Sequence, residues 1–77
     1  MPRDAVPPYR RVAAALREQI ESGALLPGEQ VPPVPRLCET YGVSRNTALR
    51  ALRVLRDDGL IKVEPGWGAF VADSSNS

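Results

Sequence analysis

Apolar residues recur every three or four positions in the first third of the chain, which is the spacing of one face of an α-helix. Between positions 9 and 22, arginines and glutamates separate the apolar residues, which are Tyr9, Val12, Ala13, Leu16 and Ile20. Pro8 suits the first turn of a helix, and Gly23 can adopt the positive φ that ends one. The pattern therefore predicts an amphipathic helix over 9–22.

Prolines interrupt the stretch that follows this helix. A pair of leucines before Pro27-Gly28 predicts a hydrophobic turn. Positions 30–31 form at most a short strand, because the prolines after them lack the N–H groups that a strand needs. A second helix can begin only near Pro35, and it is predicted to end at Gly42. The run 32–36 also resembles a polyproline ligand for an aromatic groove, but we interpret it as a rigid lead into this helix.

The segment after Gly42 is the most informative part of the sequence. Gly42 can end one helix, Val43 is expected to fill the core, and the hydroxyl of Ser44 can cap the next helix. That third helix is predicted from Arg45 to about 58, before a terminating glycine. Its core positions are Ala48, Ala51, Leu52 and Leu55. Its first turns present the polar side chains Arg45, Asn46, Thr47 and Arg50. One face therefore suits a core and the other a ligand.

The apolar period changes from the helical to the strand value after Gly59. Positions 60–63 and 69–72 predict two strands, and the glycines and proline between them predict a hairpin turn. Three helices, a short strand after the first helix and a terminal hairpin make a winged helix-turn-helix, which belongs to the α+β class and is mainly α. We expect one domain over 9–72, a flexible N-terminal arm over 1–8 and a disordered tail over 73–77.

Charge is concentrated in the predicted helix-turn-helix, although the chain of 77 residues has a net charge of only +1. Between positions 36 and 56 a single carboxylate, Glu39, accompanies the five arginines Arg36, Arg45, Arg50, Arg53 and Arg56. Arginine suits the recognition of phosphate and guanine. The alternative is that these arginines only solvate a helix face, with Arg53 and Arg56 paired to Asp57 or Glu39.

Several classes of function are excluded by what the chain lacks. It has no apolar run long enough to span a membrane and no signal peptide, so we expect a cytoplasmic protein. It has no histidine, and Cys38 is its one cysteine, which we expect to be a small buried thiol. Without an imidazole or a cluster of carboxylates, neither a metal site nor a cofactor nor an enzyme is predicted. A small binding domain is the remaining expectation.

Several of these motifs occur together, and in the same order, in one known family. They include Leu26-Pro27-Gly28, Tyr41-Gly42-Val43-Ser44-Arg45, Gly59-Leu60-Ile61 and Gly66…Gly68…Phe70-Val71. With these motifs, residues 9–72 resemble the N-terminal DNA-binding domain of the GntR family of bacterial transcription regulators. The resemblance implies a sequence-specific regulator that binds double-stranded DNA, most often a repressor that occludes a promoter.

The resemblance also implies a role for individual residues. The third helix would enter the major groove, and the glycines of the wing would approach the minor groove. Arg45 can pair with O6 and N7 of guanine, whereas Ser44 and Thr47 can bind a phosphate at the start of the helix. The full set of predicted DNA-binding residues is Arg36, Ser44, Arg45, Asn46, Thr47, Arg50, Gly66, Trp67 and Gly68.

The predicted wing tip, Gly66-Trp67-Gly68, permits more than one interpretation. It is not a nucleotide-binding loop, because a strand and not a helix follows it. Its glycines either let the wing approach DNA or simply form a hairpin turn. The ring of Trp67 is either a lid folded onto the domain or an exposed group that meets DNA or a partner.

The chain departs from the family pattern at two sites. Pro33-Val34-Pro35 stands where the family usually has serine, glutamate and arginine, so a helix cap and a phosphate-binding arginine are absent. Leu49 stands where many members have another phosphate-binding arginine. Arg36 and Arg50 are the candidates to replace these two contacts. Arg50 is offset from position 49 by about 100° around the helix.

The larger C-terminal domain that the family uses for effector binding and dimerisation is not part of this sequence. The chain is either a separated domain or a naturally minimal regulator, and its initial methionine and short tail favour the second. It would then pair on a palindromic DNA site as a homodimer or with a separate partner protein. The alternative function is a protein-interaction module that has lost DNA binding and docks through Trp67, Leu49 and Val54.

Overall fold

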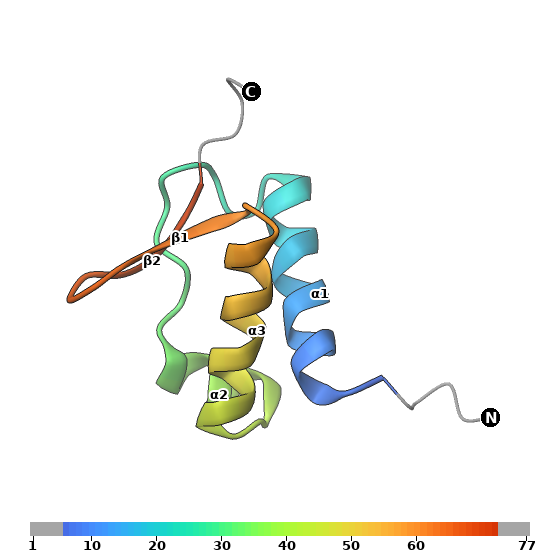
Figure 1. The fold of residues 1–77 in the computed structure, drawn as a ribbon. Helices are drawn as coiled ribbons and strands as arrows, with labels where there is room; N and C mark the ends of the chain where they lie inside the picture. Colours follow the sequence, from blue (N-terminus) through green and yellow to red (C-terminus); the bar gives the residue numbers. More distant parts are fainter. Residues whose placement is uncertain (1–5, 73–77) are drawn as a thin grey trace.

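The computed structural model describes residues 6–72. Along the chain it places α1 (Pro8–Ser22), α2 (Val34–Tyr41), α3 (Arg45–Asp57), β1 (Ile61–Glu64) and β2 (Gly68–Val71). Figure 1 shows α1 beside α3, α2 near the N-terminal end of α3, and the β1–β2 hairpin projecting to one side. This arrangement confirms the predicted winged helix-turn-helix, with its mainly helical composition.

The predicted helix boundaries need small corrections at prolines. α1 begins at Pro8, so Pro8 belongs to the helix and not to the N-terminal arm. α2 begins at Val34, one residue before the predicted start, with Pro35 as its second residue. Proline is tolerated at both places because the first N–H groups of a helix have no partner within it. The remainder of the predicted arm and tail falls mostly on residues 1–5 and 73–77, which lie outside the described part.

The hairpin is displaced slightly from its predicted bounds. The N–H of Leu60 donates to the carbonyl of Leu55 at 3.0 Å, which keeps Leu60 in the turn that closes the end of α3, so β1 begins at Ile61. β1 and β2 pair antiparallel from Ile61 opposite Val71 to Glu64 opposite Gly68. β2 therefore begins at Gly68, one residue earlier than predicted.

The segment between α1 and α2 joins the wing as a third, very short partner. Gln30 forms an isolated antiparallel bridge with Phe70. The N–H of Val31 donates to the carbonyl of Ala69, and the N–H of Val71 to the carbonyl of Glu29, both at 2.8 Å. The predicted short strand at 30–31 is thus reduced to a bridge, and it attaches β2 to the chain that enters α2.

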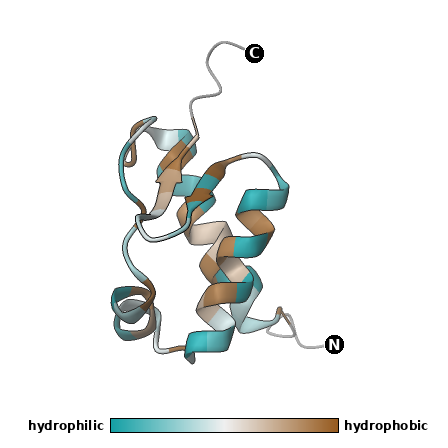
Figure 2. Cartoon of the chain, turned by 60° about the vertical axis from the view of Figure 1, so that its left-hand side comes forward, coloured by the Kyte–Doolittle hydropathy of each residue, from teal (hydrophilic) through white to brown (hydrophobic). Residues whose placement is uncertain are grey.

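One apolar core holds the helices and the wing together. Figure 2 shows hydrophobic and hydrophilic segments alternating along the helices, as their amphipathic sequences predict. Val43 packs against the core as expected, but Cys38 is only half-buried there. The buried core residues are Val12, Ala13, Leu16, Val31, Leu37, Ala48, Ala51, Leu52, Leu55, Ile61, Ala69 and Val71. Within residues 6–72 no polar or charged side chain is buried. The side-chain core is therefore stabilised by hydrophobic burial.

Candidate nucleic-acid interface

The start of α3 is capped by its own side chains. The N–H of Thr47 donates to Oγ of Ser44 at 3.2 Å, which is the predicted cap. The hydroxyl of Ser44 in turn lies 3.0 Å from Oγ1 of Thr47 and donates to it. The first turn of α3 contains no acidic residue. The positive end of the helix dipole is therefore left without a competing carboxylate, as an anion site requires.

α3 distributes the predicted contact residues over two flanks. Residues four apart lie close together on a helix surface, so Arg45, Leu49 and Arg53 follow one stripe. Leu49 and Arg53 line a groove beside the wing. On the flank that faces α1, Asn46, Thr47 and Arg50 line a hollow together with the first residues of that helix. The residues proposed for base contact and those proposed for phosphate contact thus surround the exposed face of α3.

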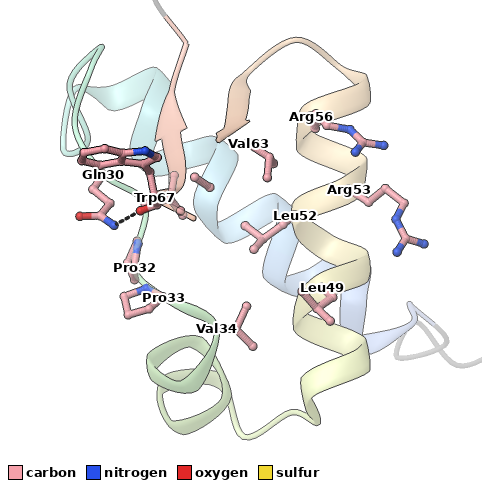
Figure 3. Close-up of a pocket in the computed structure, with 13 residues that line it drawn as sticks. Gln30, Pro32, Pro33, Val34, Leu49, Leu52, Arg53, Arg56, Val63 and Trp67 are labelled. Carbon is pink, nitrogen blue, oxygen red and sulfur yellow. Dashed lines mark hydrogen bonds between the residues drawn. The ribbon is translucent and has the colours of Figure 1, made fainter. Parts of the chain in front are cut away.

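The wing groove, as we name the hollow between α3 and the hairpin, has a volume of about 390 Å³. Figure 3 shows Leu49 and Leu52 on the α3 side facing Val34 at the start of α2, while the side chains of Arg53 and Arg56 extend outward. Its lining residues are Gln30, Val31, Pro32, Pro33, Val34, Leu49, Leu52, Arg53, Arg56, Val63, Trp67, Gly68 and Ala69. The groove combines an apolar floor with a basic edge.

The ring of Trp67 is exposed at the wing tip. Its relative exposure is 76%, so of the two interpretations of Trp67 the folded lid is wrong. The turn is held by backbone contacts, because the N–H of Trp67 donates to the carbonyl of Glu64 at 2.9 Å. The amide Nε2 of Gln30 donates to the carbonyl of Trp67 at 3.2 Å (Figure 3). Trp67 is therefore an exposed ring on an internally fixed loop.

The glycines of the wing have a reason within the fold. Gly66 has a φ of 83° and Gly68 a φ of 116°, both in the region that side chains disfavour. A Cβ at Gly68 would also lie 2.8 Å from Nε2 of Gln30. The hairpin itself therefore requires glycine at both positions. This supports the interpretation of Gly66 and Gly68 as residues of a hairpin turn. Close approach of the wing to DNA remains a prediction.

Arg50 makes a contact that the sequence did not reveal. Its guanidinium lies 4.4 Å from the centre of the Tyr9 ring, in a cation–π arrangement between α3 and the start of α1. Tyr9 was predicted as a core position, and it is half-buried against that core. This contact holds Arg50 against the start of α1, about 100° around α3 from Leu49. Its use in place of an arginine at position 49 stays a prediction.

Arg36 and the start of α2 show the effect of the proline run. Arg36 is the third residue of α2 and is exposed. The residue before the helix, Pro33, provides no side-chain hydrogen bond to the first turn, so the cap expected to be missing is indeed missing. Arg36 does not line the wing groove.

Within residues 6–72 the arginines form two ion pairs, Arg17 with Asp58 and Arg56 with Asp57. The second pair spans 3.4 Å between exposed groups, so it contributes little. Of the pairings that the alternative interpretation allowed for Arg53 and Arg56, the structure shows Arg56 with Asp57, whereas Arg53 forms no ion pair within that range. The basic character of the α3 surface is retained.

The alternative docking patch of Trp67, Leu49 and Val54 is wrong as a single surface. Trp67 and Leu49 line the wing groove. Val54 lines a separate hollow with Arg10 and Asp58, because five residues turn a helix by about 140° beyond a full turn. Only the first two residues can contact one partner at the same place.

The described part of the chain carries neither a metal cluster nor a membrane span. No group of three histidine, cysteine, aspartate or glutamate side chains in residues 6–72 could hold a metal ion. No helix of this range is long and apolar enough to cross a bilayer.

The sequence that forms the helices and the wing matches a known family. The sequence model of the bacterial regulatory proteins of the gntR family covers residues 8–71. The chain belongs to the GntR family. This assignment confirms the resemblance inferred from the motifs, and it places the chain among the bacterial regulatory proteins of that family.

Curated relatives and solved structures agree with the GntR assignment. The chain is 42% identical over 73 residues to the histidine utilization repressor of Klebsiella aerogenes, covering 94% of this chain and 30% of that protein. It is 45% identical over 67 residues to the histidine utilization repressor of Pseudomonas aeruginosa, covering 87% and 27%. A crystal structure of the AraR DNA-binding domain with operator ORX1 superposes with a TM-score of 0.88 at 32% identity, covering 94% of this chain and 87% of that one. The GntR chain thus spans under a third of the length of these curated relatives.

Proposed function

We propose that this GntR-family domain binds double-stranded DNA in a sequence-specific manner and forms the operator-binding part of a transcription repressor. The observation that carries the proposal is the capped, acid-free start of α3, with the wing on one flank and Arg50 held on the other. Such a surface presents N–H groups and guanidinium groups toward one side, as a duplex requires. An AraR domain of the same fold has been crystallised with its operator.

Individual residues would divide the work of binding. Arg45, in the first turn of α3, would pair with a guanine in the major groove. Ser44 and Thr47 would bind a phosphate through the helix start, and Arg50 would bind another phosphate from its position over Tyr9. These contacts would place α3 in the groove and fix its register.

The remaining predicted residues would extend this contact. Asn46 would face the groove beside Arg45, and Arg36 would approach the backbone from α2. Gly66, Trp67 and Gly68 would bring the wing tip to the minor groove. The exposed Trp67 ring would lie against the sugar-phosphate strand there.

Two copies on a pseudo-palindromic site would give useful occupancy. One domain with four or five phosphate contacts should bind with a salt slope of about −4, close to non-specific strength. Two copies related by a two-fold axis should double that slope and add a second set of base contacts. A homodimer or a separate partner protein would provide the pairing. A repressor that occludes a promoter requires no catalysis. Such a protein would lie with the chromosome in the cytoplasm.

The experiment that tests the function is selection of duplexes from a random DNA library, followed by fluorescence anisotropy on the selected site at several salt concentrations. We expect a single enriched motif and an affinity that falls steeply with salt. Arg10→Ala is a matched control, because Arg10 lies away from the wing groove, in the hollow that contains Val54. Absence of DNA binding at low salt would contradict the proposal and favour the protein-interaction alternative, through Trp67 and Leu49 alone.

A further inference from the structure

Leu49 is an apolar residue in a stripe of arginines. Arg45 precedes it by four residues and Arg53 follows it by four, so the three side chains lie one above another on α3. Leu49 and Arg53 both line the wing groove. Leu49 therefore lies one turn along α3 from Arg45, at the edge of the wing groove.

The fold does not account for this leucine. Leu49 is half-buried, but it belongs neither to the buried core nor to the partly buried hydrophobic residues that pack against the core. Val54, on the same helix, does pack against the core. Leu49 instead faces Val34 across the open end of the wing groove, as Figure 3 shows. Its apolar surface therefore remains available to a ligand of α3.

Double-stranded DNA offers one apolar group in the major groove, the 5-methyl group of thymine. A leucine can neither bind a phosphate nor form hydrogen bonds with base edges. We propose that Leu49, with Val34 beside it, contacts the 5-methyl group of a thymine and selects a T·A pair at one position of each half-site. This inference rests on the proposed DNA-binding function and adds a specificity-determining residue to it.

The position of Leu49 on α3 restricts where that thymine lies. Four residues along a helix advance its axis by about 6 Å. Successive bases of a strand are separated by about 3.4 Å. With α3 lying along the major groove, the thymine would lie about two base pairs from the pair that Arg45 contacts.

Replacement of single thymines by deoxyuridine tests the contact, because deoxyuridine lacks only the 5-methyl group. The duplex is the site selected from a random library, with each thymine replaced in turn, and binding is measured by fluorescence anisotropy. The wild-type domain should lose about fourfold in affinity at one thymine of each half-site, the factor expected for a buried methyl-sized group. Deoxyuridine elsewhere should have no comparable effect.

Protein variants then assign the effect to Leu49. Leu49→Ala should bind the thymine and deoxyuridine duplexes equally well. Leu49→Arg should also lose the preference, while its salt slope steepens by about 0.9 for one added phosphate contact. Val54→Ala is the matched control, because it shortens a half-buried side chain on the other flank of α3, and it should keep the fourfold preference. Circular-dichroism melts establish that each variant is folded.

Two results would overturn the inference while leaving the proposed function intact. The first is wild-type binding that is indifferent to deoxyuridine at every thymine of the site. The second is a folded Leu49→Ala variant that retains the wild-type preference for thymine. Failure to bind any duplex at low salt would overturn the proposed function, and this inference with it.

Discussion

Replacement of Leu16 by alanine tests how α1 packs in the core. Leu16 has a relative exposure of 1% and is among the largest fully buried side chains of the described part. Truncation of a buried leucine costs about 2 to 5 kcal/mol, because it removes apolar burial and leaves a cavity. A domain of 77 residues has a free energy of unfolding of about 4 to 12 kcal/mol. The substitution should therefore remove a large share of the stability.

The same chemical change at Leu26 provides the control. Leu26 is 54% exposed, so Leu26→Ala should alter the free energy of unfolding by about 0.5 kcal/mol or less. Thermal unfolding followed by circular dichroism should show a fall in Tm of at least about 8 °C for Leu16→Ala. Urea unfolding should show a lower midpoint at an unchanged slope. Equal Tm values for the two variants would refute the packing of α1 described above.

Three further predictions concern the interface and the wing. Arg45→Ala should lose about 1 to 3 kcal/mol of DNA-binding free energy and relax the preference at one base pair. Thr47→Ala should weaken binding to all DNA sequences about equally. Identical selected motifs for wild type and Arg45→Ala would contradict this division of roles. Tyr9→Leu should flatten the salt slope of DNA binding as much as Arg50→Ala does. Tyr9→Phe should keep the slope, because phenylalanine retains the ring under the guanidinium. Equal slopes for both Tyr9 variants would argue against the contact. Gly68→Ala should destabilise the domain by about 1 to 3 kcal/mol because of its positive φ; an unchanged urea midpoint would contradict that geometry.

The order and type of the helices could be predicted because their signals are local. Ser44 caps α3 through a residue only three positions away, and Gly23 and Gly42 end helices by their own conformation. The errors at Pro8 and Pro35 amount to one residue each, because proline is tolerated at more than one position of the first turn and so does not fix the first residue of a helix.

Contacts between segments that are far apart in the sequence could not be predicted from local patterns. The contact of Arg50 with Tyr9 depends on the packing of α3 against α1, which periodicity does not specify. The exposure of Trp67 depends on the hairpin and on Gln30, from a different part of the chain. The position of Val54 away from Leu49 could have been predicted, because helical geometry alone separates the two.

The backbone bonds between segment 29–31 and β2 have a consequence for the proposed binding of DNA by the domain. They connect the wing to the chain that leads into α2, and α2 packs against α3. The distance from the third helix to the wing tip is consequently set by the protein. A duplex whose groove dimensions differ from that distance, such as A-form RNA with its deep and narrow major groove, would fit α3 or the wing but not both. The domain would thus distinguish DNA from RNA by helix geometry, before any base is contacted.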